Sequence, residues 1–291
     1  QRFADDEVLC GDTGKRGMGL LTDDTGRTFT TLGPAEEVTV EERGPERACV
    51  LVKGHHLAAD RARLFAYEVR IMAYAGQKFL RLFYTFGNDE LKNEFTLLRE
   101  LRLELPLKGG AARFEMGGEA PPLLKELATR SPLGTQQGSV ADSPLVFQDS
   151  DEHFAFASSA AKTEGRRAAG WTRAAGNRAT MTVAVRDFWR LYPKALAVDA
   201  KGIKVGIMPP LRDDQYAEQA KDPEKLVHLY YNLLGGRYKI KQGQTKTHEL
   251  LISFEEKANA TALDAFQQGV MAAAPSAWVC GSLALGPFAP T

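Results

Sequence analysis

The chain has 291 residues, with 37 lysines and arginines against 37 aspartates and glutamates, so its formal net charge is zero. Hydrophobic residues make up 44% and charged residues 25%, which is typical of a folded globular protein rather than a disordered or collagen-like chain. The balanced charge offers no basic surplus for nucleic acid or anionic lipid. No apolar run approaches the roughly 20 residues that span a bilayer. We therefore expect neither a nucleic-acid partner nor a membrane.

The cysteines and the chain ends indicate little about the compartment. Cys10, Cys49 and Cys280 lie far apart. They form neither a metal-ligand cluster nor a disulfide framework, because both require matched spacings. The chain opens at Gln1 without a signal-peptide pattern, and residues 286–291 have the composition of a linker. We expect a processed chain or one part of a longer protein.

Most of the chain alternates apolar and polar residues with a period of two, which predicts half-buried antiparallel strands. In chain order, strands are expected over 48–52, 65–71, 80–86, 95–105, 181–185, 203–207 and 250–254. The turn at Ala75-Gly76-Gln77 joins two of them in a long hairpin. Between about residues 108 and 170 the alternation fades, which is consistent with a strand-poor insertion or with edge strands and long loops.

Helical signals are few. Asp222 and Pro223 supply an N-cap and a first-turn proline for a helix that ends at Gly235-Gly236. The alanine-rich segment 258–274 predicts a second helix, and 121–129 predicts a short third. Strands dominate, so the sequence predicts an all-β fold. We expect a large antiparallel β-sandwich, similar to a supersandwich, with a few short helices.

The last predicted strand begins with a candidate catalytic group, Lys246 and His248. His248 shares its parity with Leu250 and Ile252, so its side chain points to the apolar-lined face. A histidine in such a position serves as a general base, as a neutralising charge or as a hydrogen-bonded core residue. The pattern leaves these alternatives open.

A second group lies where a predicted strand runs into a loop. Arg186, Asp187, Trp189 and Tyr192 combine a cation, a carboxylate, an indole and a phenol. Carbohydrate sites use this mixture, because aromatic faces stack on sugar rings and fixed charges bind uronates. The alternative is an ion pair beside an exposed aromatic residue. Trp171, among several arginines, is a further candidate for an acidic-sugar subsite, with a solvated basic loop as its alternative.

Metal and phosphate motifs are weak. His55 and His56 are adjacent, so on a strand they point to opposite faces and cannot share one ion. His153 lies among acidic residues that suit calcium, although an acidic surface loop explains them more simply. The glycine-rich segment 11–19 lacks the Walker spacing. We expect no metal and no cofactor, and calcium has no specific support.

Three stretches carry a resemblance to a known family. They are Tyr74-Ala75-Gly76-Gln77-Lys78-Phe79-Leu80-Arg81 with Thr85-Phe86-Gly87-Asn88-Asp89, then Val185-Arg186-Asp187-Phe188-Trp189 with Tyr192-Pro193-Lys194, and lastly Thr245-Lys246-Thr247-His248-Glu249-Leu250. In order and spacing they resemble the exo-rhamnogalacturonan lyase-like polysaccharide lyases, in which a RIFT-type barrel precedes a central β-sandwich and a helical domain follows. The resemblance implies N-terminal strands or the end of a barrel over 1–37, the central sandwich over 38–287, and the start of a linker to a further domain over 288–291.

This resemblance implies β-elimination at a uronic acid, as in rhamnogalacturonan. Such a lyase neutralises the uronate carboxylate, removes the C5 proton with a base and protonates the leaving oxygen with an acid. On chemical grounds we assign neutralisation to Arg186 or Lys246, the base to His248 and the acid to Tyr192. A tyrosine serves both proton roles if a nearby cation lowers its pKa. The expected substrate-binding residues are Asp187, Trp189 and Trp171.

Two other functions stay open. One is a non-catalytic carbohydrate-binding or structural sandwich of a larger enzyme, whose chemistry other domains supply. The other is a hydrolase, which requires two carboxylates about 5–10 Å apart, with Asp187 and Glu249 as the candidates. The expected partners are an acidic polysaccharide or oligosaccharide and further domains of the same protein. An extracellular glycan favours secretion.

Overall fold

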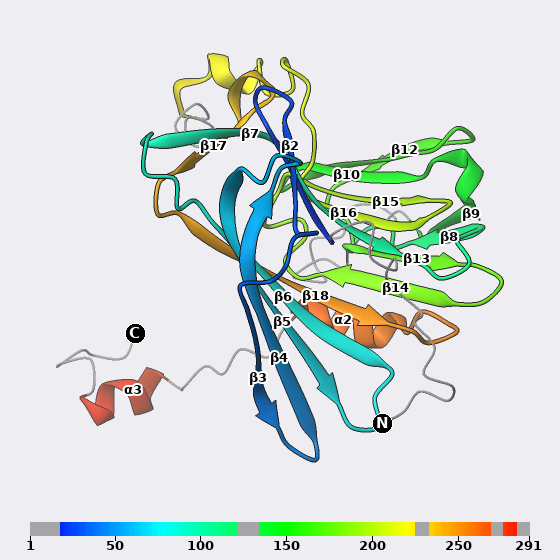
Figure 1. Cartoon of the computed structure of the whole chain (residues 1–291). Helices are drawn as coiled ribbons and strands as arrows, with labels where there is room; N and C mark the ends of the chain where they lie inside the picture. Colours follow the sequence, from blue (N-terminus) through cyan, green and yellow to red (C-terminus); the bar gives the residue numbers. More distant parts are fainter. Residues whose placement is uncertain (1–17, 121–133, 225–232, 269–275, 284–291) are drawn as a thin grey trace.

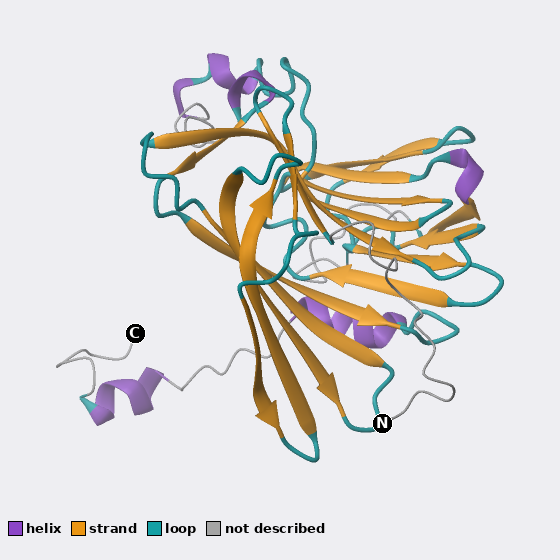
Figure 2. Cartoon of the chain, in the orientation of Figure 1, coloured by secondary structure: helices purple, strands orange, loops and turns teal. Residues whose placement is uncertain are grey.

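A computed structural model of the chain describes residues 18–120, 134–224, 233–268 and 276–283. Strands form most of these residues, and each strand pairing among them is antiparallel (Figure 2). The predicted all-β class is therefore confirmed. No helix within the described residues is long and apolar enough to cross a membrane.

The elements follow one another along the chain in this order. The strands are β1 (Gly19–Asp23), β2 (Thr28–Thr30), β3 (Glu37–Arg43), β4 (Arg47–Leu57), β5 (Arg63–Tyr74), β6 (Phe79–Gly87), β7 (Phe95–Pro106), β8 (Arg113–Met116), β9 (Gln136–Ser139), β10 (Leu145–Ser150), β11 (His153–Ala157), β12 (Lys162–Gly165), β13 (Trp171–Ala175), β14 (Thr180–Val185), β15 (Lys194–Asp199), β16 (Gly202–Met208), β17 (Tyr238–Lys241) and β18 (Thr245–Ser253). The α-helices are α2 (Ala260–Gln268) and α3 (Ser276–Ser282), and short 3-10 helices span Val140–Asp142, Gln219–Lys221 and Leu234–Gly236.

The strands form two layers that pack face to face (Figure 1). One layer runs β3-β4-β5-β6-β18-β14-β13-β8-β9. The other runs β2-β1-β7-β16-β15-β10-β11-β12, with β17 beside the first part of β7. A single pair between β2 and β4, Thr30 with Leu57, connects the layers.

Side-chain alternation decides which residues fill the space between the layers. Successive residues of a strand point to opposite faces, so every second residue is buried over 82–86 of β6 and over 101–105 of β7. The core between the layers includes Leu82, Tyr84 and Phe86 from β6 and Leu101, Leu103 and Leu105 from β7. Each such side chain contributes about 1.5–3 kcal/mol by leaving water. These contacts hold the layers together.

The sequence-based strand predictions are confirmed at all seven segments, and the hairpin is formed by β5 and β6. The described part of segment 108–170 contains the short strands β8 to β12 joined by loops. Of these, β9 and β12 lie at sheet edges, whereas β8, β10 and β11 are paired on both sides, so the edge-strand alternative is correct only in part. Within 258–274 the described helix is α2. The predicted helix over 121–129 and most of the helix that starts at Asp222 lie outside the described residues.

A buried polar pair connects three adjacent strands of the first layer. His56 Nδ1 lies 2.9 Å from the Phe65 carbonyl oxygen, which only accepts, so this nitrogen carries the proton and donates. His56 Nε2 therefore accepts from the Tyr84 hydroxyl at 2.6 Å. Burial lowers the pKa of His56 to about 4 and raises that of Tyr84. Gly19 on β1 lies close above the pair, since a Cβ there would sit 3.2 Å from the Tyr84 hydroxyl.

Replacing Tyr84 with phenylalanine is expected to lower the free energy of unfolding by about 1–3 kcal/mol, because His56 Nε2 then stays buried without a donor. Urea unfolding followed by circular dichroism measures the change. Tyr74→Phe is the control, because its hydroxyl is not paired with a buried histidine: it contacts Arg81 at 3.4 Å and Met72 at 3.8 Å and interacts with the exposed Arg47. It should cost less than about 0.5 kcal/mol. Equal losses in both variants would contradict the role of the pair.

The same pair predicts a pH dependence of stability. The pKa of His56 is 6.5 in its ordinary state and about 4 in the folded chain, so the unfolded state binds the proton more readily. The stability contribution is complete above pH 6.5 and is lost as the pH falls towards 4. Between about pH 7 and about pH 5 it accounts for about 2 kcal/mol of the free energy of unfolding.

Replacing both partners, as in His56→Leu with Tyr84→Phe, should remove this part of the pH dependence. Ordinary carboxylates titrate mainly below this interval, so they contribute little to it. Urea unfolding at a series of pH values measures the slope for wild type and double variant. Identical slopes would show that His56 does not titrate as described.

Candidate functional site

The basic and phenolic candidates meet in a pocket between the two layers. It has a volume of about 160 Å³ and lies where β15, β16, β17 and β18 come together. Its polar lining consists of Tyr192, Lys194, Tyr238, Gln244, Lys246 and His248. The other lining residues are apolar, and Lys194, Tyr238 and His248 are themselves buried.

Strand β18 supplies two of these groups because of its pairing with β6. His248 lies opposite Tyr84 and Lys246 lies opposite Phe86, two inward-facing positions of β6. The His248 ring is stacked beside the Phe86 ring, with centroids 6.1 Å apart and planes 11° from parallel. His248 is only 2% exposed. Neither of its ring nitrogens has a hydrogen-bond partner within the described part of the chain.

Lys194 is the first residue of β15 and reaches the same pocket from the other layer. It has the parity of Leu196 and Val198, which are buried, and it is itself only 3% exposed. Its Nζ donates to the Ile207 carbonyl oxygen at 2.7 Å. A second contact, to the Pro193 carbonyl oxygen, is at the long limit of 3.5 Å. The Tyr192–Pro193 peptide bond before it is cis.

The electrostatics follow from burial of basic groups beside one another. Burial lowers the pKa of His248 well below its ordinary value, and the positive charges of Lys194 and Lys246 lower it further. Burial and Lys246 lower the pKa of Lys194, and burial lowers that of Lys246. His248 is therefore a neutral imidazole near neutral pH, which is the state that accepts a proton.

Tyr192 stays protonated near neutral pH. Burial raises the pKa of its phenol, and the carboxylate of Asp151 raises it further. The tyrosine is thus suited to donate a proton. A second role as base would require a lowered pKa, and the shift is in the other direction.

The structure places Arg186 on the opposite face of the first layer. Adjacent residues of β18 alternate, so Glu249 points outward where His248 points inward. Arg186 and Arg81 both donate to Glu249. Arg186 also lies over the Phe266 ring of α2, 4.4 Å from its centroid. It holds α2 against the sheet and does not line the pocket.

The aromatic candidates also lie outside this pocket. Trp171 is 6% exposed and packs against Leu263 and Phe266 of α2. Arg167 and Arg190 lie over the Trp189 ring, at 4.3 and 4.8 Å from its centroid. A ring so covered has less free surface for stacking on a sugar.

Asp187, the remaining candidate, forms an ion pair with Arg190. The structure thus brings Tyr192, Lys246 and His248 together and leaves Arg186, Asp187, Trp189 and Trp171 apart from them. Lys194 was not among the candidate site residues. Its shared parity with Leu196 and Val198 is the signal that could have found it.

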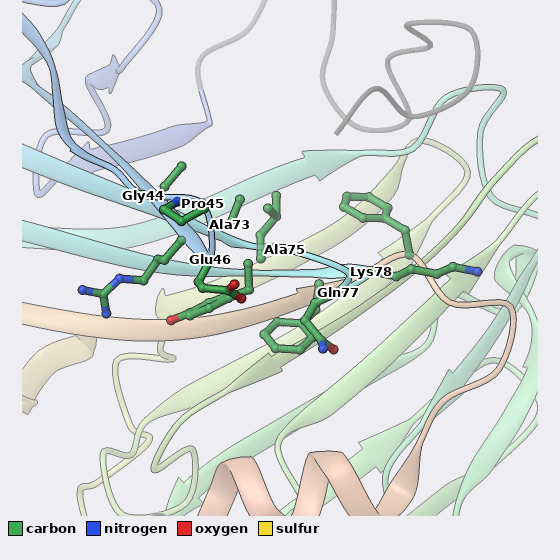
Figure 3. A pocket seen from close by; sticks show the side chains of 13 residues that line it. Gly44, Pro45, Glu46, Ala73, Ala75, Gln77 and Lys78 are labelled. Atoms are coloured by element: carbon green, nitrogen blue, oxygen red, sulfur yellow. The ribbon is translucent and has the colours of Figure 1, made fainter.

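A larger hollow of about 310 Å³ lies at the far end of β4, β5 and β6. Figure 3 shows Gly44, Pro45 and Glu46 on one side of it, with Gln77 and Lys78 on the β5–β6 turn. The Lys78 side chain extends away from Glu46 (Figure 3). Size alone favours this hollow, but its lining contains no buried acid–base group. We therefore place the chemistry in the smaller pocket.

The described residues contain no group of three or more histidine, cysteine, aspartate or glutamate side chains that could hold a metal ion. In the acidic loop considered for calcium, His153 contacts Asp149 at 2.7 Å. Glu152 there pairs with Arg166.

Comparison with known families supports the resemblance found in the sequence. Residues 16–112 match the family model described as "PcRGLX-like protein central beta sandwich domain". The match covers β1 to β7 and supports the rhamnogalacturonan lyase-like central β-sandwich that the sequence resembles. It contains the first of the three resembling stretches, and the other two lie beyond the match. No curated protein matches the sequence.

Comparison with solved structures finds weak similarities, for example the following three. A galactose mutarotase-like protein from Lactobacillus casei ATCC 334 is 14% identical, with a TM-score of 0.36 over 85% of this chain and 84% of that one. The GalM/aldose epimerase homologue from C. elegans is 13% identical, with a TM-score of 0.30 over 85% and 81%. The GH36 alpha-galactosidase AgaA from Geobacillus stearothermophilus is 9% identical, with a TM-score of 0.41 over 82% and 30%. Similarities this weak assign no function.

Replacing Lys194 with methionine is expected to raise the free energy of unfolding near neutral pH by about 1–3 kcal/mol, because burying the amine costs more than its bond to Ile207 returns. The pKa of Lys194 is lowered from 10.5 in the folded chain. The free-energy cost of burying the charged amine is therefore greatest at pH values well below 10.5, and it decreases as the pH rises towards 10.5. Urea unfolding at two pH values measures it.

Lys201→Met is the matched control, because Lys201 lies exposed in the turn between β15 and β16. It should leave the stability within about 0.5 kcal/mol of wild type. A marked loss of stability in Lys194→Met would show that the lysine is a structural group.

Proposed function

We propose that this chain is the β-sandwich part of a polysaccharide lyase that cleaves a uronic-acid-containing glycan, such as rhamnogalacturonan, by β-elimination. The observation that carries the proposal is the meeting of Lys246, His248 and Tyr192 in one pocket. These are a cation, a neutral base and a protonated acid, the three groups that the reaction needs. The family match over residues 16–112 supports the same reaction class.

The proposed steps use each group in the protonation state that its surroundings favour. Lys246 pairs with the uronate carboxylate, which stabilises the negative charge that develops at C5. Neutral His248 accepts the C5 proton, and the electrons of that bond form the double bond between C4 and C5. The C4–oxygen bond breaks, and Tyr192 donates its proton to the departing oxygen. Atoms and charges balance without a cofactor.

A non-catalytic carbohydrate-binding domain is the second candidate. The small volume of the pocket, about 160 Å³, favours it, because such a space admits a carboxylate and part of one sugar ring. A hydrolase has less support: Glu249 is held between Arg81 and Arg186, and Asp187 is paired with Arg190. We propose further that an acidic glycan and further domains of the same protein are the partners, with secretion as the matching location.

The test is incubation of the chain with rhamnogalacturonan and other uronate polysaccharides, with ultraviolet absorbance reporting the conjugated double bond. A steady rise is expected on one substrate. Substituting His248 with alanine should lower the rate by about 10²–10⁴-fold, because the base is lost. His153→Ala, at a histidine that lies outside the pocket and contacts Asp149, is the control and should keep the rate.

Other results would point elsewhere. Sugar binding without any rise in absorbance would favour the non-catalytic domain. Products that lack the unsaturated sugar would favour a hydrolase. An unchanged rate in His248→Ala, with His153→Ala also unchanged, would contradict the assignment of the base.

A further inference from the structure

The pocket gathers three basic side chains. Lys194 comes from β15, and Lys246 and His248 come from β18. Among its described residues, the pocket lining includes no aspartate or glutamate. The whole chain is neutral, so this local excess of basic groups is a property of the site and not of the composition. Such a site attracts an anion.

Lys194 is buried, and it is the hardest of these groups to explain as part of the fold. A lysine at an inward position of a strand gives up its hydration, which costs several kcal/mol for a charged amine. In the folded chain the amine makes one short hydrogen bond, to the Ile207 carbonyl oxygen. A methionine or leucine would fill the same space without that cost. The amine is therefore suited to a ligand.

His248 gives an independent indication of a ligand. The side chain is almost wholly buried and borders the pocket. Both of its ring nitrogens lack a hydrogen-bond partner among the residues that the structure describes. Buried polar groups are normally hydrogen-bonded, so two open nitrogens in one ring mark a place where a polar ligand belongs.

We propose that Lys194 anchors one carboxylate group of the ligand and that this carboxylate binds together with the uptake of one proton. The inference rests on the proposed function only for the identity of the ligand, a uronate. The carboxylate site itself follows from the buried amine, the open imidazole and the absence of an acidic partner in the lining.

The proton uptake follows from the charges that face Lys194. The groups around the pocket are Lys246 and His248 of β18, Tyr192 before β15 with Asp151 acting on it, and Tyr238 of β17 with Tyr216 and Glu100 acting on it. Burial and Lys246 hold the pKa of Lys194 well below 10.5. A carboxylate placed against the amine favours its charged form and raises that pKa. Between the two values, binding draws a proton from solution.

The proton goes to Lys194 rather than to His248. Both side chains are buried, but the amine is the stronger base, with an ordinary pKa of 10.5 against 6.5 for the imidazole. The charge on Lys194 and on Lys246 also opposes protonation of His248. The carboxylate thus leaves the imidazole neutral, which is the state that the proposed elimination requires.

Isothermal titration calorimetry with D-galacturonate tests the inference. The measurement is repeated in buffers of different ionisation enthalpy, from about pH 6 to about pH 10, because the dependence of the heat on the buffer gives the number of protons bound. We expect binding with uptake of up to one proton, and weaker binding as the pH rises. D-galactose, which lacks the carboxylate, should bind at least about tenfold more weakly.

Two variants locate the effect. Lys194→Met should weaken D-galacturonate binding at least about tenfold and remove the proton uptake. Lys201→Met carries the same change of side chain at an exposed position and should bind as wild type does. Circular dichroism and urea unfolding establish that both variants are folded.

Several outcomes would overturn the inference. They are binding without proton exchange at every pH, proton uptake that persists in Lys194→Met, and no binding by the folded wild-type chain up to about 10 mM D-galacturonate. The monosaccharide has no glycosidic bond to eliminate, so the test is separate from the lyase assay. A chain that binds with proton uptake but makes no unsaturated product retains this inference and loses the proposed function. A chain that makes the unsaturated product but binds D-galacturonate without proton uptake retains the proposed function and loses this inference.

Discussion

The pairing of β6 with β18 is the constraint on which the rest of the site depends. Nine residues of each strand, Phe79–Gly87 and Thr245–Ser253, face one another in an unbroken register. The register sets Lys246 and His248 on the inward face. It sets Glu249 on the outward face, where Arg81 and Arg186 hold it and α2 covers the sheet nearby (Figure 1). A slip of one residue would exchange the two faces.

The outward and inward faces of the first layer differ in how their charged side chains are paired. On the outside, Glu249 forms ion pairs with Arg81 and Arg186, and Arg186 also contacts Phe266 of α2. These contacts help to hold the sheet and α2 together. On the inside, Lys194 and Lys246 share a pocket whose described lining residues include no acid to balance them. Stability favours the first arrangement, and an unbalanced buried charge persists where function requires it. The inside of the layer pair is therefore where a charged ligand belongs.

The family match and the pocket come from different parts of the chain, and the fold connects them. The match ends at residue 112, whereas the basic groups of the pocket lie on β15 and β18. β6 lies within the match and pairs directly with β18, and β7 pairs with β16, the neighbour of β15. The matched part of the chain thus contributes Phe86 to the described lining of the pocket, and the later strands supply its chemistry.

Local alternation in the sequence determined seven of the eighteen described strands, the β5–β6 hairpin and the inward direction of His248, because side-chain direction in a regular strand follows parity. It could not show that Arg186, close to Tyr192 in sequence, points to the other face and belongs to Glu249. Nor did it join Lys194 to a histidine 54 positions later along the chain. Which strands become neighbours is decided by long-range pairing and by the packing of two layers, and these bring distant residues together only in the folded chain.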